Sequence, residues 1–242
     1  MACFSSLSTL GAALILAAAG DPAAAPGSQP LVIGTDDSFP PYVQPLPQGG
    51  YEGYDIDVMT EICRRSGHDC QWQTAAFDEL IPGVMSGRFD AAIGGIAITP
   101  ERRALVDFTA PYADADEVEW FVGLPGAPPP EDSLTAVQSG TIHEAWLRAQ
   151  GLGYESFATE AEALAAVVQH HAQLALGPFT DRPDLEPMLQ GAGLGFLYQV
   201  DIPDEGTGIV LCKGSDLKDE FDAAIAAMRG DGTLDLFDSR WF

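Results

Sequence analysis

A short segment, residues 94–102, combines the residue types that bind a carboxylate. Two glycines at its start let a ligand approach the backbone, and exposed N–H groups there could bind an anion. Thr99 is a good helix N-cap, Pro100 suits the first helical position and Glu101 favours the first turn. The guanidinium of Arg102 can hold a carboxylate through two parallel hydrogen bonds. The segment predicts an anion site, unless Arg102 is only a surface ion-pair residue.

Alternating strand-like and helix-like runs must position this segment. The first half of the chain predicts strand 31–35, helix 55–65, strand 71–73, helix 77–86 and strand 89–93. This βαβαβ order predicts an α/β fold with a mainly parallel sheet and helices on both faces. An apolar strand at 117–124 then runs into a Pro/Gly cluster at 126–130, which marks a boundary.

A second alternating set follows the boundary. It predicts strands at 135–137, 174–176, 196–198 and 208–211 and helices at 141–149 and 160–169. An amphipathic helix with Phe221, Ala224, Ile225 and Met228 facing inward comes next, and a short helix closes the chain. Ligands of such folds bind beyond the carboxyl ends of the strands. The loops expected at the site are therefore 36–41, 75–77, 94–102, 138–143 and 176–181.

The composition and the N-terminus exclude several classes of protein. Acidic residues outnumber basic ones by 36 to 11, for a formal net charge of −25. Such a surface repels phosphate backbones, so nucleic-acid binding is not expected. Residues 1–29 hold an apolar stretch of signal-peptide length followed by small residues, although the usual basic start is missing. They predict a leader and export to the periplasm. No later segment is apolar enough to cross a membrane.

The cysteines point to an oxidising compartment. Cys63 and Cys70 lie at the end of a helix-like run and the start of a strand-like run, where they can form a disulfide. A metal site is the alternative, but no second Cys or His pair has ligand spacing, so no metal or cofactor is expected. Cys212 is left over and is expected to be a small buried hydrophobic residue.

Several motifs together resemble the periplasmic amino-acid-binding proteins of ABC importers, the group that includes histidine, lysine/arginine/ornithine and glutamine binders. The matching stretches are 33–36 with 39–42, 53–58, 77–90, 98–109, 137–141 and 231–242. The spacing of Cys63 and Cys70 resembles the disulfide of the histidine-binding branch. The resemblance implies a two-lobed periplasmic-binding-protein fold of type II. Each lobe would be a mainly parallel sheet flanked by helices, and two hinge strands would join the lobes.

The same resemblance implies the domain boundaries. Lobe I would comprise residues 30–116 with 208–242, and lobe II residues 117–207. The hinges are expected near 113–120 and 203–210.

The resemblance also implies roles for individual residues. Arg102 corresponds to the residue that binds the ligand's α-carboxylate, and Thr141 to a helix start in the other lobe that binds the same group. Phe39 and Phe77 fall where apolar side chains sandwich the ligand, with core packing as the alternative. Asp36 falls where binders of basic ligands hold a distal cation, with a turn or capping role as the alternative.

Three departures from the family pattern concern the site. Gly95 and Ala97 replace residues that often carry hydroxyls, so only their backbone groups remain. Ile142 follows Thr141 where a second threonine is common. Residues 174–178 lie where the second lobe usually supplies an aspartate for the α-ammonium group, and Asp181 is the candidate replacement.

These observations predict a binding protein rather than an enzyme. It would capture a carboxylate-bearing small molecule, expected to be an amino acid, by lobe closure and deliver it as a monomer to an ABC permease. One alternative is an accessory or sensory partner protein on this fold that transports no ligand. Another is a cyclohexadienyl-dehydratase-like enzyme, but its acid–base candidates, Asp36, Asp37, Asp181 and His143, form no recognisable pair.

Overall fold

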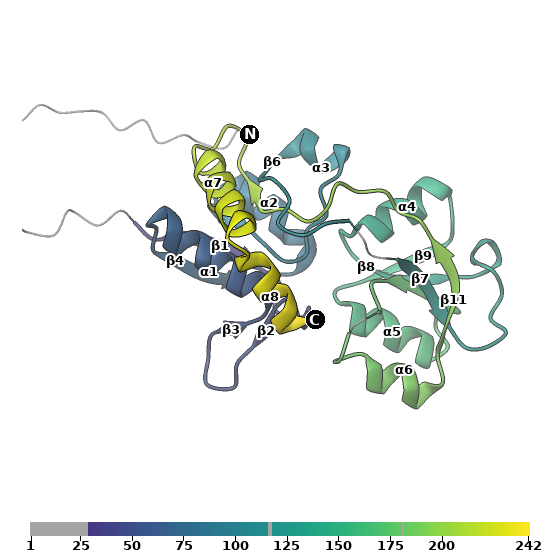
Figure 1. Cartoon of the computed structure of the whole chain (residues 1–242). Coiled ribbons are helices and arrows are strands. Elements are labelled where there is room, and N and C mark those ends of the chain that lie inside the picture. The colour runs from purple at the N-terminus through teal and green to yellow at the C-terminus, as the bar shows by residue number, and fades with distance from the viewer. Residues whose placement is uncertain (1–28, 116–117, 181) are drawn as a thin grey trace, which may run out of the picture.

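The protein folds into two lobes, each built on a five-stranded sheet (Figure 1). The computed structural model describes residues 29–115, 118–180 and 182–242. The expected leader, apart from its last residue, and Asp181 lie outside the described residues. Within those ranges no helix has the length and hydropathy needed to span a bilayer.

The sheet of the first lobe has the strand order β4-β1-β5-β12-β6. Its strands are β1 (Leu31–Thr35), β4 (Cys70–Thr74), β5 (Ala91–Ala92), β6 (Asp107–Phe108) and β12 (Val210–Leu211). Its helices are α1 (Tyr54–Ser66), α2 (Phe77–Ser86), α3 (Pro100–Leu105), α7 (Leu217–Gly230) and α8 (Thr233–Trp241). A small hairpin, β2 (Gln44–Pro45) with β3 (Tyr51–Glu52), projects from this lobe.

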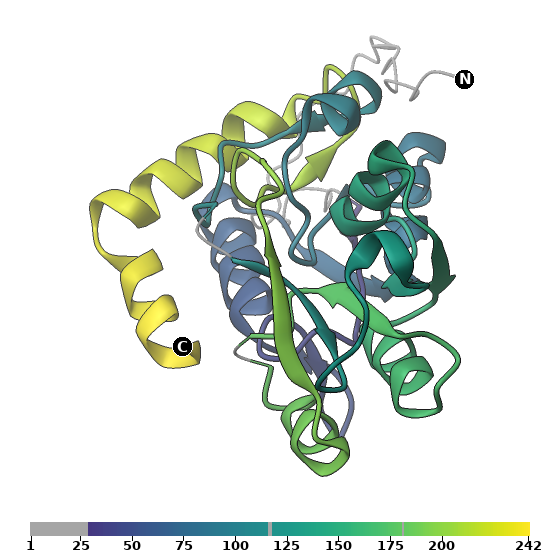
Figure 2. The ribbon, with the colours of Figure 1, turned by 90° about the vertical axis from the view of Figure 1, so that its right-hand side faces the viewer.

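The sheet of the second lobe has the order β11-β7-β10-β8-β9. Its strands are β7 (Glu119–Gly123), β8 (Thr135–Gln138), β9 (Tyr154–Phe157), β10 (Leu174–Gly177) and β11 (Gly195–Val200). Three helices flank it: α4 (Ile142–Gln150), α5 (Glu160–Val168) and α6 (Glu186–Ala192). A 3-10 turn at Pro130–Asp132 follows the Pro/Gly cluster. Figure 2 places this lobe in front.

Alternation along the strands builds a core on each face of each sheet. In the first lobe Ile33, Ala91 and Leu211 pack with α1 and α7, whereas the neighbouring Ala92 and Val210 pack with α2. The second lobe repeats the arrangement, with clusters on either side of β7, β8 and β10. Successive side chains of a strand point to opposite faces, so short apolar strands supply both cores.

The sheets are mixed rather than mainly parallel, which corrects one detail of the expected fold. In the first lobe β1 pairs in parallel with β4 and β5, but β12 pairs antiparallel with β5 and β6. In the second, β8 pairs in parallel with β9 and β10, and β7 pairs antiparallel with β10 and β11. The antiparallel pairings arise where the chain crosses between lobes and re-enters a sheet from the other side.

Two chain segments connect the lobes and lie side by side. Tyr112 N–H donates to the carbonyl of Thr207 at 2.9 Å, and Thr207 N–H donates to Ala113 at 2.9 Å. Thr207 also bridges to Ala97 in the loop before α3. The two crossings therefore behave as a paired connection rather than as independent linkers.

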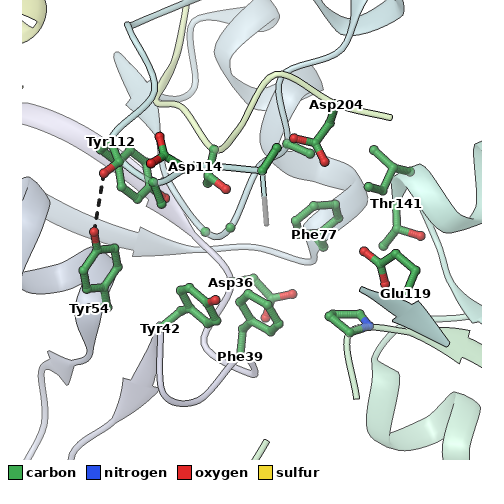
Figure 3. A pocket seen from close by; sticks show the side chains of 18 of the residues that line it. Asp36, Phe39, Tyr42, Tyr54, Phe77, Tyr112, Asp114, Glu119, Thr141 and Asp204 are labelled. Atoms are coloured by element: carbon green, nitrogen blue, oxygen red, sulfur yellow. Dashed lines mark hydrogen bonds between the residues drawn. The ribbon is translucent and has the colours of Figure 1, made fainter. Parts of the chain in front are cut away.

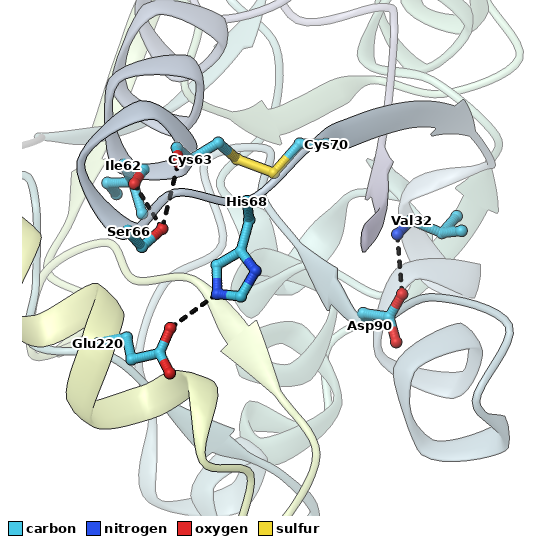
Figure 4. Close-up of a disulfide and its surroundings, with 8 residues drawn as sticks. All are labelled: Val32, Ile62, Cys63, Ser66, His68, Cys70, Asp90 and Glu220. Atoms are coloured by element: carbon cyan, nitrogen blue, oxygen red, sulfur yellow. Dashed lines mark hydrogen bonds and ion pairs between the residues drawn. A yellow bond between two sulfur atoms is a disulfide. The ribbon is translucent and has the colours of Figure 1, made fainter. Parts of the chain in front are cut away.

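The predicted disulfide between Cys63 and Cys70 is present. It ties the last turn of α1 to the first residue of β4 (Figure 4). No group of residues suited to a metal ion occurs in the described part of the chain. Cys212 is only partly buried against the cluster around Phe89, and it is disulfide-bonded rather than an unpaired hydrophobic residue.

Candidate functional site

A cavity of about 440 Å³ lies between the lobes, where the predicted ligand loops meet. Every predicted site residue within the described ranges lines it: Asp36, Phe39, Phe77, Gly95, Ala97, Arg102 and Thr141. Figure 3 shows side chains converging on it from both lobes. The remaining candidate, Asp181, lies outside the described residues.

Arg102 reaches the cavity from the first turn of α3. Thr99 caps this helix as predicted, because its hydroxyl accepts the N–H of Arg102 at 3.3 Å. The guanidinium donates to two neutral acceptors, the carbonyls of Ala97 at 2.7 Å and Gly140 at 3.0 Å. Among the described residues, no carboxylate forms an ion pair with it. Burial lowers the pKa of Arg102 to about 10, and the charge of Asp204 opposes that shift. At neutral pH the group is therefore a partly desolvated cation whose acceptors are both neutral.

Gly95 contributes to the site differently from the prediction. Its N–H is not free for a ligand, because it donates to the Asp55 carboxylate at 2.8 Å. Tyr112 donates to the other oxygen of Asp55 at 2.9 Å. The φ of Gly95 is +61°, and a Cβ there would lie 2.5 Å from the Phe39 ring. The glycine therefore shapes the cavity wall and makes room for Phe39.

Thr141 stands at the start of α4 in the second lobe. It is the N-cap: its hydroxyl accepts the N–H of Glu144 at 3.2 Å and donates to the carbonyl of Gln138 at 2.9 Å. The side chain is thus committed to capping. The groups available to a ligand are instead those of the helix start, where backbone N–H groups and the helix dipole favour an anion.

Asp36, directly after β1, is buried and well supplied with donors. One oxygen accepts the N–H and hydroxyl of Ser38, at 2.9 and 2.7 Å, and the other accepts Gln138 Nε2 at 3.3 Å. Desolvation raises its pKa despite these bonds. The turn role that the sequence left open is therefore real. Asp36 also makes a contact between the lobes.

The two predicted sandwich residues occupy unequal positions. Phe39 stacks on Tyr42 with ring centroids 4.6 Å apart, and the guanidinium of Arg182 lies 4.7 Å from its centroid. Phe77 begins α2, with the guanidinium of Arg102 at 5.8 Å from its ring. Phe77 therefore offers an aromatic surface next to the guanidinium of Arg102. Phe39 already has two neighbours on its ring.

Sequence reasoning missed two buried groups of acidic and basic side chains in the second lobe that reach the cavity. His143 Nε2 lies 2.6 Å from Glu119 Oε2, and both side chains are 6% exposed. Arg182 pairs with Glu160 and with Asp184. Glu119, His143 and Glu160 all line the cavity. A polar residue at the edge of an apolar strand was the only available signal for Glu119.

The cavity is strongly acidic. Seven carboxylates line it within the described ranges, against two guanidinium groups: Asp36, Asp114, Glu119, Glu160, Asp204, Asp235 and Asp238 against Arg102 and Arg229. Low-dielectric walls strengthen the field of such a cluster. A ligand with one carboxylate and surplus positive charge fits this balance better than a simple anion.

Direct contacts between the lobes show that this is a closed arrangement. Ser139 donates to Asp78 at 2.9 Å, beside the contacts of Arg102 with Gly140 and of Gln138 with Asp36. At the rim, Arg182 donates to the Ser38 carbonyl at 3.4 Å. These bonds can form only when the cleft shuts.

Comparison with known proteins agrees with this geometry. Residues 31–242 match the family of bacterial extracellular solute-binding proteins, family 3. ABC transporter arginine-binding protein 1 of Escherichia coli (strain K12) is 26% identical over 90% of this chain and 93% of its own.

Solved structures give the same picture. A periplasmic His/Glu/Gln/Arg/opine family-binding protein from Silicibacter pomeroyi, in complex with lysine, matches with a TM-score of 0.79 and 31% identity, covering 88% of this chain and 96% of the other. An ancestral amino-acid-binding protein that is a precursor of cyclohexadienyl dehydratase matches with a TM-score of 0.71 and 26% identity, covering 88% and 95%.

Proposed function

Because the chain belongs to the bacterial extracellular solute-binding proteins of family 3, we propose that its cleft captures a basic amino acid. The protein is the periplasmic binding component of an ABC transporter, and it passes its ligand to a membrane permease. The proposal about the ligand rests on one observation above all. Arg102 is a partly desolvated cation in the cavity, and both its acceptors are neutral carbonyls.

A ligand carboxylate would be a far better acceptor for Arg102 than these carbonyls. Charge-assisted and bidentate hydrogen bonds are roughly twice as strong as neutral ones. The helix start at Thr141 faces the same cavity from the second lobe, so one carboxylate can be held from both sides. Phe77 supplies an aromatic surface for the ligand's side chain, and Asp36 lies in the cavity as a partner for a distal cation.

The preference for a basic side chain follows from the excess of carboxylates. A zwitterionic ligand leaves the cavity's negative charge unchanged, whereas a second cationic group reduces it. The arginine-binding relative and the lysine complex support this choice of ligand class.

Lobe closure is the proposed mechanism of capture. Lobe I, residues 30–116 with 208–242, and lobe II, residues 117–207, would turn about hinges near 113–120 and 203–210. The paired crossings at Ala113 and Thr207 support this placement. Shifting the ratio of closed to open molecules from 1:99 to 99:1 requires the ligand to bind the closed form more tightly by about 5.5 kcal/mol. Carboxylate contacts from both lobes form only on closure, so they contribute to that difference.

Calorimetry with purified mature protein tests the ligand class. We expect L-arginine or L-lysine to bind at micromolar concentration or tighter, and L-glutamate to bind much more weakly. Small-angle scattering should show a more compact particle with the ligand. Tighter binding of L-glutamate than of either basic amino acid would contradict the proposal. Light scattering should give the mass of a monomer.

A dehydratase-like activity has one specific observation in its favour. His143 and Glu119 form a buried acid–base pair in the cavity, whereas the sequence suggested that His143 had no such partner. The similarity to a precursor of cyclohexadienyl dehydratase adds to it. We propose that the protein is not an enzyme, because ligand release to a permease needs no chemical step. Turnover of prephenate or arogenate by the purified protein would overturn this.

A further inference from the structure

We infer that Glu119 binds the ammonium group of the ligand, and that His143 positions the carboxylate of Glu119. The inference rests on the proposed function, because it assigns a further residue to the same cleft. It also narrows the ligand class, since it requires an amino group next to the carboxylate that Arg102 holds.

Glu119 is placed to face the ligand. It is the first residue of β7, where the chain has just entered the second lobe, and it is 5% exposed. It lines the cavity, and Figure 3 draws it beside Thr141. A carboxylate this deeply buried needs a cationic or hydrogen-bonding partner to offset its desolvation.

The contact with His143 leaves most of the hydrogen-bond acceptor positions of Glu119 unused. His143 Nε2 and Glu119 Oε2 are 2.6 Å apart, but the contact is poorly directed and neither atom has a hydrogen bond within the described ranges. A carboxylate has about four lone-pair positions, so one imidazole contact leaves most of them open. His143 can thus orient the Glu119 carboxylate, but it does not fill the remaining acceptor positions of that group.

The other two buried carboxylates of the cavity have more hydrogen-bond or ion-pair partners than Glu119 has. Asp36 accepts from Ser38 and Gln138, and Glu160 is paired with the permanently charged Arg182. An arriving ammonium would have to displace a guanidinium from Glu160. At Glu119 it meets only an imidazole, whose contact with the carboxylate is not a hydrogen bond. Glu119 is therefore the buried carboxylate most open to a new cation.

The position also fits the covalent structure of an amino acid. In an α-amino acid the ammonium and the carboxylate are attached to the same carbon, Cα, so the two groups must bind close together. Thr141, at the proposed carboxylate site, is two residues from His143, and both line the cavity with Glu119. Pro178, directly after β10, lines the same cavity and has no polar side-chain atom. An ammonium facing Pro178 alone would be buried without a partner.

Matched ligands separate this role from a structural one. We would titrate L-arginine against 5-guanidinopentanoate, and L-lysine against 6-aminohexanoate, which lack only the α-amino group. The wild-type protein should prefer the amino acid in at least one pair. In Glu119→Gln that amino acid should bind about 100-fold more weakly, while the deaminated partner changes by less than about threefold. Glu119→Asp should recover part of the preference.

Two further variants test the positioning role and the specificity of the effect. His143→Gln keeps a donor nitrogen at a similar reach and should retain most of the preference, whereas His143→Leu should lose about tenfold of it. Glu155→Gln changes an exposed carboxylate of β9 outside the cavity and should have no effect.

The outcomes distinguish this inference from the proposed function. Equal losses for both members of a pair in Glu119→Gln and Glu119→Asp would mean that Glu119 only supports the fold. Unchanged binding of both members in Glu119→Gln would also overturn the inference. If the wild-type protein binds none of the four compounds, the proposed function itself fails. If it binds both members of each pair equally, the proposed function is supported, but the inference that Glu119 binds an ammonium group is wrong.

Discussion

Arg102, from the first lobe, donates a hydrogen bond of 3.0 Å to the carbonyl of Gly140, in the second. The same guanidinium donates to Ala97 within its own lobe at 2.7 Å. One side chain therefore bonds both to a loop of its own lobe and, across the cleft, to the other lobe. A ligand carboxylate that engages Arg102 would sit where the lobes meet, which couples binding to closure.

Replacing Arg102 should therefore weaken ligand binding strongly. Arg102→Ala is expected to cost about 2–4 kcal/mol of binding free energy, because it removes a charge-assisted contact from a desolvated cleft. Arg102→Lys should recover only part of this, since an ammonium lacks the guanidinium fork. Arg103→Ala removes the adjacent arginine, which pairs with Glu205 at the surface, and is the control. Calorimetry that finds Arg102→Ala and Arg103→Ala alike would move the carboxylate site elsewhere.

Gly140 offers a way to block closure without replacing any side chain of the proposed binding site. Its φ is +76°, and a Cβ there would lie 2.7 Å from the Cβ of Asp78 in the other lobe. Gly140→Ala should hold the lobes apart and weaken binding by about 1–3 kcal/mol. Gly151→Ala has a similar φ of +70° but open space around the new Cβ, so it reproduces the backbone strain alone.

Scattering and calorimetry on these two variants would be compared with the wild-type protein. Gly140→Ala should stay extended when ligand is added, and Gly151→Ala should become compact. Equal compaction of both would show that this contact does not limit closure.

The sequence predicted most of the longer strands and most helices, because their signals are local, but not the mixed pairing of the sheets. Strand β1, helix α2 and the capped start of α3 lie where periodicity and capping residues placed them. Strand β9 and helix α6 were missed: β9 has little burial, and α6 contains Pro187 and Gly191. Neither has the apolar periodicity that identifies an element from sequence alone.

The cavity residues that belong to sequence motifs were predicted. The cavity residues that depend on contacts between distant parts of the chain were missed. Arg102 and Thr141 belong to local capping patterns, so their positions could be inferred. Glu119 and His143 are 24 residues apart on different elements, and only the folded sheet brings them together. The Gly95 N–H looked available from its loop sequence, but Asp55, on α1, occupies it.

The disulfide should contribute measurable stability. Cys63 and Cys70 close a loop with a sequence separation of 7, which the chain-entropy model values at about 2–3 kcal/mol. Cys63→Ser with Cys70→Ser should lower the free energy of unfolding by about that amount in urea titrations. Ligand affinity should change little, since neither cysteine lines the cavity. An unchanged urea midpoint in the double variant would mean that α1 and β4 are held together without the bond.

The charge cluster at the end of α1 predicts a specific acid sensitivity. Glu61 accepts hydrogen bonds from Arg64 and Arg65, which lower its pKa from 4.5 to about 2. Arg65 also pairs with Asp231, just before α8, so the cluster ties two helices together. A lowered folded-state pKa means that the stabilisation is complete above pH 4.5 and is lost as the pH falls through about 2.

Glu61→Gln should therefore destabilise the protein by about 1 kcal/mol at pH 7, a value typical of a partly exposed ion-pair network. The difference from the wild-type protein should shrink steadily between pH 4.5 and pH 2 and vanish near the lower limit. Urea unfolding at a series of pH values measures it, with Glu155→Gln, an exposed carboxylate without an ion pair within the described ranges, as the control. A destabilisation that is the same at pH 7 and pH 2.5 would show that Glu61 acts by packing rather than by its charge.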